Sequence, residues 1–134
     1  MDRRQRIAIS EFVSERTPRP LMGPILNFDL SEEIAALRSE SVWHAHGHNA
    51  RTLIKHSEYR VVLIALRSGS HVHEQQTDER LAIQTLRGQV RLHVPTESVD
   101  LGPNQLVSLD RHVPFSLEAI EDCDFLLWLG WSKD

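Results

Sequence analysis

The stretch from Arg60 to Val94, RVVLIALRSGSHVHEQQTDERLAIQTLRGQVRLHV, decides the fold. It contains three apolar runs joined by turns at Gly69 and Gly88, and a His-x-His pair, His71 and His73, follows the first turn. Short apolar runs bounded by glycine turns are typical of β-strands. We therefore predict a system of hairpin strands here, and we expect the rest of the chain to pack around it.

The runs differ in pattern. Residues 60–67 are almost continuously β-branched or aliphatic, which predicts a strand that is buried on both faces. Residues 81–86 and 89–94 form a predicted hairpin across Gly88, in which every second residue of the second strand faces the core.

Further predicted strands flank this system. One precedes it at 51–56, and four follow it at 99–101, 105–109, 115–120 and 124–131. Together with the run at 71–76 this makes about nine short strands, and their close and even spacing is typical of an antiparallel sandwich or barrel. The sequence therefore predicts an all-β fold and not alternating strand–helix units.

One helix is predicted before the strands. Leu30, Ile34 and Leu37 recur at helical spacing and form an apolar stripe. We expect a helix over about 30–39 that packs its stripe on a sheet.

The N-terminal segment is expected to be an arm. Residues 1–24 contain three prolines and have no clean periodicity, so we expect them to pair with the barrel edge or with another subunit. The predicted organisation is an arm over 1–24 and a single domain over 25–134, with the barrel itself over about 50–131.

Three histidines alternate after the predicted helix, at His44, His46 and His48. On a strand they would share a face, which is a geometry that metals use. Gly47 and Asn49 favour a loop or an irregular entry into a strand instead. We interpret the three as exposed histidines on a connection.

Composition excludes several classes of protein. The chain has 134 residues and a formal net charge of −4, which suits one domain and argues against a nucleic-acid surface. The single cysteine, Cys123, fits a reducing compartment, and the neighbouring Asp122 and Asp124 are expected to raise its pKa. The longest apolar run is too short for a membrane span. We expect a cytoplasmic protein with neither membrane nor nucleic-acid partners.

Two segments resemble the motifs of a known family. These are GSHVHEQQTDERLAIQTLRGQVRL at 69–92 and DLGPNQLVSLDRHVPFSLEAIEDCDFLLWLGW at 100–131, and they resemble the two motifs of the cupins. The resemblance covers about 50–131 and implies a double-stranded β-helix, or jelly-roll barrel, with the helix packed on it. Cupins include dioxygenases, isomerases, storage proteins and ligand-sensing domains, so the resemblance implies a fold and not one function.

The resemblance also implies where a metal would bind. The first motif of the family reads G-x5-H-x-H-x3-4-E-x6-G, and the second adds a third histidine. Counting from the two turn glycines places the first three ligands at Gln75, Thr77 and Leu81, and the second motif places the fourth at Phe115. An amide and a hydroxyl are poor ligands, and the two apolar side chains cannot coordinate a metal. The usual metal site is therefore expected to be absent.

The histidines that are present do not fall in this register. His71 and His73 lie four residues too early, which displaces them by about 13 Å along a regular strand. Only a bulge in the strand would bring the two histidines to the metal positions. His112 lies three residues before Phe115, on the other side of Pro114, and is also a poor substitute.

The favoured hypothesis is a metal-free cupin barrel. Its mouth would bind a small organic ligand through oriented hydrogen bonds, or serve a sensing or structural role. The residues expected to line this mouth are Gln75, Thr77, Gln84 and Phe115. No cofactor is favoured under this hypothesis, and no catalytic residue is assigned.

Two enzymatic alternatives stay open. The first is a mononuclear metal enzyme of the dioxygenase or isomerase type, with iron, nickel, manganese or zinc held by His71 and His73 and by Glu74, Glu79 or His112. The second is a metal-free isomerase or epimerase that uses His71 or His73 as a base, which requires an acidic partner that the sequence does not identify.

Assembly is the last expectation. The C-terminal run 125–131 is apolar on both faces, so one face fits the barrel and the other needs a cover from the helix or from a second subunit. We predict a homodimer.

Overall fold

The computed structural model describes residues 6–7 and 23–130, which form ten strands and two helices. In chain order the elements are β1 (Arg6–Ile7), α1 (Leu30–Ser39), α2 (Ser41–His46), β2 (His48–Lys55), β3 (Tyr59–Leu66), β4 (His71–Gln75), β5 (Arg80–Arg87), β6 (Val90–Val94), β7 (Glu97–Leu101), β8 (Leu106–Leu109), β9 (Phe115–Ala119) and β10 (Cys123–Gly130). None of the helices in this part of the chain is long and apolar enough to cross a membrane.

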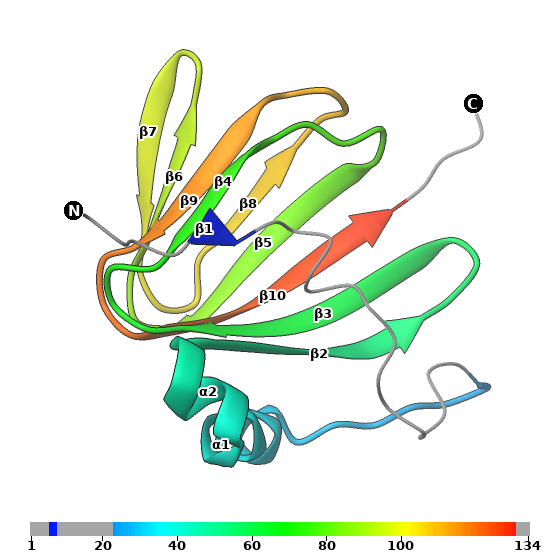
Figure 1. The fold of residues 1–134 in the computed structure, drawn as a ribbon. Coiled ribbons are helices and arrows are strands. Elements are labelled where there is room, and N and C mark those ends of the chain that lie inside the picture. Colours follow the sequence, from blue (N-terminus) through cyan, green and yellow to red (C-terminus); the bar gives the residue numbers. More distant parts are fainter. Residues whose placement is uncertain (1–5, 8–22, 131–134) are drawn as a thin grey trace.

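The strands form two five-stranded sheets that face each other across one core (Figure 1). The first sheet has the order β1-β4-β9-β6-β7, and the second has the order β2-β3-β10-β5-β8. The pairings are antiparallel except that of β1, which runs parallel to β4 and places Arg6 opposite His71. The predicted all-β jelly-roll barrel is confirmed. The arm adds a strand to its own barrel at residues 6–7. Its residues 23–24 are also described, whereas 1–5 and 8–22 lie outside the described part.

Strand β3 separates two apolar cores because its alternate residues point to opposite faces. Val62, Ile64 and Leu66 are at most 1% exposed and belong to the core between the sheets. The residues between them, Val61, Leu63 and Ala65, belong to a second core under the helices. The prediction that 60–67 is buried on both faces is therefore confirmed from Val61 to Leu66.

Helix α1 packs across β2 and β3 and supplies Ile34 and Leu37 to the second core (Figure 1). The carboxylate of Asp29 caps the helix by accepting a hydrogen bond from the backbone N–H of Glu32 at 3.2 Å. The predicted helix, its boundaries at 30–39 and its apolar stripe are confirmed.

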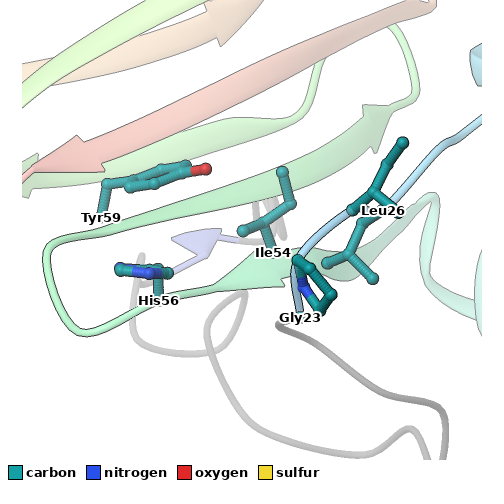
Figure 2. Close-up of a pocket in the computed structure, with 7 residues that line it drawn as sticks. Gly23, Leu26, Ile54, His56 and Tyr59 are labelled. Carbon is teal, nitrogen blue, oxygen red and sulfur yellow. The ribbon is translucent and has the colours of Figure 1, made fainter.

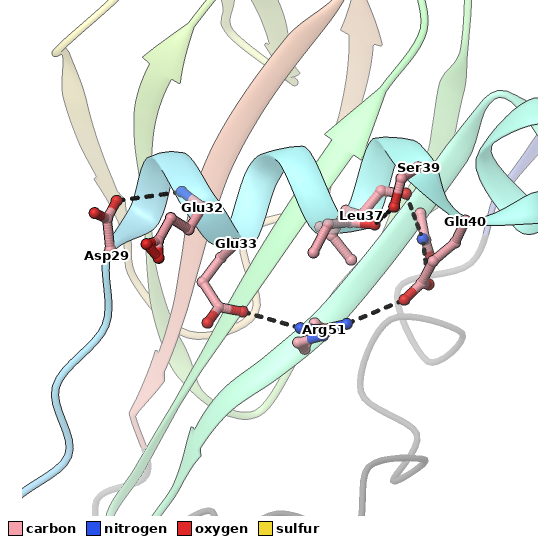
Figure 3. Close-up of polar contacts among 9 residues, drawn as sticks. Asp29, Glu32, Glu33, Leu37, Ser39, Glu40 and Arg51 are labelled. Carbon is pink, nitrogen blue, oxygen red and sulfur yellow. Dashed lines mark hydrogen bonds and ion pairs between the residues drawn. The ribbon is translucent and has the colours of Figure 1, made fainter.

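Charged side chains fix α1 to the sheet. Arg51 on β2 donates to Glu33 at 3.1 Å and to Glu40 at 3.0 Å (Figure 3). On the other side of the helix, Arg38 donates to the fully buried carboxylate of Asp124 at 2.9 Å. Burial raises the pKa of Asp124, and the nearby positive charge of Arg38 opposes that rise. This network is structural because it spans the contact between helix and sheet.

The segment after α1 forms a second helix that the sequence did not predict. Helix α2 ends at Gly47, which has a φ of 74° and caps the helix in the left-handed conformation. His44 and His46 are exposed on this helix, whereas His48 lies on β2. The segment before Gly47 is a helix where a loop or an irregular strand entry was expected, and the three histidines do not share the face of one strand. The expected exposure is confirmed for His44 and His46, whereas His48 is half-buried.

Candidate ligand site at the barrel mouth

The mouth of the barrel is the end at which β4 stops and β9 begins. Gln75 is the last residue of β4, Phe115 is the first of β9, and the two lie opposite each other in the ladder. Thr77 follows in the connection to β5, and Leu81 enters the core from the other sheet. The structure therefore brings Gln75, Thr77 and Phe115 to one end of the barrel.

A bulge in β4 determines which way Gln75 faces. Val72 lies opposite Leu117 and Gln75 lies opposite Phe115, so three residue steps on β4 match two on β9. One extra residue on a strand reverses the alternation of the side chains that follow it. Since directly paired residues share a face and Phe115 belongs to the core, Gln75 is on the interior side of the sheet.

The connection that holds Thr77 is tied to the turn before β9. The backbone N–H of His112 donates to the carbonyl of Thr77 at 2.9 Å, and Nε2 of His112 lies 2.9 Å from the carboxylate of Asp78. The Thr77 hydroxyl donates to the carbonyl of Glu79 at 2.8 Å. A hydroxyl that donates one hydrogen bond still accepts others, so Thr77 offers an acceptor at the mouth.

Two charged residues that were not expected to meet, Arg60 and Glu79, also lie at this end. Arg60 begins the alternation that continues with Val62 and Ile64, so it is on the interior side of β3. Glu79 precedes β5 and interacts with the guanidinium of Arg60. Burial raises the pKa of Glu79, the charge of Arg60 lowers it, and the charge of Asp78 raises it further. The same alternation was visible in the sequence and could have identified Arg60.

The residues at the cupin metal positions do not fit a metal ion. Phe115 is 1% exposed and Leu81 is 4% exposed, so apolar side chains occupy two of the four positions. Gln75 and Thr77 supply only an amide and a hydroxyl at the other two. Within residues 6–7 and 23–130, no three His, Cys, Asp or Glu side chains are close enough together to hold a metal ion.

The His-x-His pair lies away from the mouth. His71 is opposite Glu118 at the other end of β4, and Val72, the residue between the two histidines, points into the core. His71 and His73 are therefore on the outer side of the first sheet, where His71 is half-buried and His73 is exposed. His71 lies before the bulge and His73 lies within it, between Val72 and Gln75, but His73 stays exposed and is not brought to the mouth.

Gln84 lies on the outer side of the other sheet. It sits between Ile83 and Thr85, both fully buried inside the barrel. Its side-chain oxygen accepts a hydrogen bond from the indole N–H of Trp128 at 3.3 Å. The structure thus separates Gln84 from the other three residues expected at the mouth.

Two histidine–carboxylate pairs in the described part of the chain involve histidines other than His71 and His73, the bases expected under the isomerase hypothesis. Nε2 of His93 lies 3.3 Å from Glu118, and Nε2 of His112 lies 2.9 Å from Asp78. Both His93 and His112 have substantially exposed side chains. The pairs therefore lie at the surface and not inside a water-excluded pocket.

Comparisons of the fold find cupins among the similar solved structures. A salicylate 1,2-dioxygenase from Pseudaminobacter salicylatoxidans superposes with a TM-score of 0.72 at 17% identity, over 83% of this chain and 36% of that chain. A cupin-2 domain protein from Shewanella frigidimarina gives 0.64 at 10% identity, over 78% and 94%. A conserved protein of unknown function from Streptococcus pyogenes gives 0.68 at 15% identity, over 90% and 100%.

Comparisons of the sequence find no relative. No family model matches the chain, and no curated protein matches it. The jelly-roll topology, the two glycine-bounded motifs and the similarity to solved cupins agree on one conclusion, which concerns the architecture. The chain has the cupin fold.

Proposed function

We propose that this protein is a metal-independent cupin barrel that binds a small organic ligand at its mouth. The observation that carries the proposal is the buried Phe115, which stands where the second cupin motif supplies a metal ligand. Leu81 at a second ligand position supports the same conclusion. The mouth is thereby left with hydrogen-bonding groups instead of a coordination shell.

The packing of the barrel supports a site at the mouth and not deep inside it. Phe115, Leu81 and Leu129 are each at most 4% exposed and close the interior with apolar side chains. At the mouth, next to these apolar side chains, Thr77 contributes a hydroxyl, and the pair Arg60 and Glu79 contributes opposite charges. Few polar groups over an apolar surface are the usual composition of a small-molecule site. The ligand class that this favours is a small polar molecule with hydroxyl or carboxylate groups.

Metal content tests the metal-independent part of the proposal. The chain is purified without a polyhistidine tag and its iron, nickel, manganese and zinc are measured by mass spectrometry. We expect far less than one metal ion per chain and no change in melting temperature on chelation. One tightly held ion per chain, lost in a His71→Ala/His73→Ala variant, would instead support the mononuclear metal enzyme.

Ligand binding is tested with a panel of small sugars and hydroxy acids. Compounds that raise the melting temperature are titrated in ¹H–¹⁵N spectra, where we expect the amide signals of Gln75 and Thr77 to move. The variant Thr77→Val keeps the shape of the side chain and removes its hydroxyl, so it should weaken binding about fivefold, as expected for one hydrogen bond. Ser98→Val, on the outer side of the first sheet, serves as the control.

A further inference from the structure

A pocket lies on the outside of the barrel, beside the turn between β2 and β3. It has a volume of about 270 Å³ and is lined by residues 23–26, Ile54, His56 and Tyr59. Figure 2 shows the rings of His56 and Tyr59 on one side of it and Gly23 and Leu26 on the other, with Ile54 between them. The pocket therefore has one aromatic wall and one aliphatic wall.

This pocket is separate from the barrel mouth. Tyr59 and Arg60 are consecutive on β3 and so point to opposite sides of the sheet. Arg60 is on the interior side with Val62, whereas Tyr59 is on the outer side, where its ring lies 6.4 Å from that of Trp128. A ligand in this pocket would lie on the other side of the second sheet from a ligand at the mouth.

The aromatic wall is built by a fixed turn. The rings of His56 and Tyr59 are stacked, with centroids 5.5 Å apart and planes 23° apart. The backbone N–H of His56 donates to the carbonyl of Tyr59 at 2.8 Å, which closes the turn. Because the turn and the stacking hold both rings, the wall is preformed and a ligand would not have to order it.

The wall also supplies hydrogen-bond donors. Nδ1 of His56 accepts a hydrogen bond from the backbone N–H of Glu58 at 3.4 Å. In a neutral imidazole one nitrogen accepts and the other carries the proton, so this bond assigns the ring proton to Nε2. The Tyr59 hydroxyl is a second donor. Two donors beside apolar walls match a ligand that is flat and carries an acceptor.

The size of the pocket limits the ligand. A volume of about 270 Å³ lies just below the usual range for small-molecule sites, which begins at about 300 Å³. Two large side chains that line the pocket are also exposed, Tyr59 to 37% and Ile25 to 82%. Covering such groups is favourable. We propose that this pocket binds a small molecule with a single aromatic ring and a carbonyl or carboxylate acceptor.

The test compares two probes that differ only in the ring. Benzamide has an aromatic ring and a carbonyl, and cyclohexanecarboxamide has the same carbonyl on a saturated ring. Each is titrated into the full chain in ¹H–¹⁵N spectra. We expect benzamide to move the amide signals of Ile54, His56 and Tyr59 in a saturable way, with an affinity at least about fivefold higher than that of the saturated probe, because stacking needs the aromatic face.

Variants identify the donor. His56→Phe keeps a stacked ring and removes the Nε2 proton, so it should weaken benzamide binding about fivefold. His56→Gln keeps a donor and removes the ring, and it should also weaken binding, which covers the case in which one variant fails to fold. His44→Phe, on the exposed face of α2, is the matched control and should leave the affinity unchanged.

Three results would overturn the proposal. The first is the absence of any saturable shift with benzamide. The second is equal affinity for the two probes. The third is a set of shifts confined to Gln75 and Thr77 at the mouth, which would agree with the proposed function and contradict the outer site.

Discussion

At the scale of single residues, Gly88 in the turn between β5 and β6 is under the tightest constraint. Its φ is 78°, a conformation that residues with a Cβ rarely adopt. A Cβ at this position would lie 2.8 Å from the Cα of Cys123 and closer still to the carbonyl oxygen of Asp122. We expect Gly88→Ala to lower the free energy of unfolding by about 3–5 kcal/mol, because backbone strain and a backbone clash add.

Gly69 provides the control for this substitution. Its φ is 89°, but no atom lies within 4 Å of where its Cβ would be. Gly69→Ala should therefore show the strain alone, at about 1–2 kcal/mol. Urea denaturation of the two variants measures both losses of unfolding free energy. Equal losses would mean that the close approach at Gly88 does not constrain the turn.

The buried carboxyl of Asp124 makes stability depend on pH. Burial raises its pKa above the ordinary value of 3.8, since this effect exceeds the opposing effect of Arg38. The carboxyl of Asp124 has a pKa near 3.8 in the unfolded chain and a higher pKa in the folded chain. Between these two values the unfolded chain releases a proton that the folded chain keeps, so the free energy of unfolding falls as pH rises through this window. Asp124→Asn removes this titration. We expect the stability of the wild type relative to the variant to decline as pH rises from below 3.8.

Asp100 provides the opposite case. Its hydrogen bond with Arg91, at 2.7 Å, lowers the pKa of its carboxyl. Relative to Asp100→Asn, the wild type should therefore gain stability as pH rises toward 3.8. Urea denaturation at a series of pH values measures both trends, and the same sign for the two residues would contradict the assigned causes.

Residue chemistry could be predicted from the sequence only where it depends on sequence neighbours. Asp122 and Asp124 predicted a raised pKa for Cys123, and the pKa is raised to about 12. The largest cause is burial, however, which depends on the packing of β10 between β3 and β5. The neighbouring aspartates therefore predicted the direction of the pKa shift of Cys123, but they are not its main cause.

At the scale of elements, the register of β4 decides where a metal could bind. The family places its ligands at Gln75, Thr77, Leu81 and Phe115, and three of these lie on or beside the β4–β9 ladder. We expect the variant Gln75→His/Thr77→His/Leu81→Glu/Phe115→His to bind about one cobalt ion per chain, since imidazole and carboxylate are ligands that such metals accept. The absorption spectrum of the cobalt complex measures the binding.

Removal of the natural pair serves as the control for the restored site. His71→Ala/His73→Ala in the restored background should leave cobalt binding unchanged, because both histidines are on the outer side of the first sheet. A folded restored variant without cobalt binding would show that the register is misassigned. Binding that is lost with His71 and His73 would point to the alternative metal site.

Periodicity predicted long elements better than short ones. The apolar stripe of α1 extends over about two turns and gave its boundaries, whereas α2 has six residues and no repeat of its own. The alternation of β5 also indicates on which side of the strand Gln84 lies. Ile83 and Thr85 are buried on one side of the strand, so Gln84 between them has to lie on the other.

At the scale of the whole molecule, the order of the strands in the sheets could not be derived from the patterns alone. Strand β10 lies between β3 and β5, so the last strand of the barrel is central in its sheet. Alternation indicates that a segment is a strand and which of its faces is buried, but it does not name the neighbouring strands. The resemblance to cupins supplied that information, because it implies a complete topology.

The outer side of the second sheet is the surface on which we expect a second copy to pack. Helix α1 covers the part of this side near β2 and β3, whereas Trp128 on β10 is 37% exposed and Leu106 on β8 is 66% exposed. We predict a homodimer in which this uncovered part is the contact. Sedimentation at micromolar concentration should give twice the mass of one chain.

A charge introduced on this surface should separate the copies without unfolding them. Leu106 lies on an edge strand and packs little in the monomer, so Leu106→Asp should change the stability of a single chain by only about 0.5 kcal/mol. Burying that carboxylate against a second copy is costly, which should shift the equilibrium to the monomer. Thr96→Asp adds the same charge in the exposed turn after β6, on the other sheet, and should leave the dimer intact. A wild-type chain that sediments as a monomer, or a Leu106→Asp variant that stays dimeric, would exclude this surface as the contact.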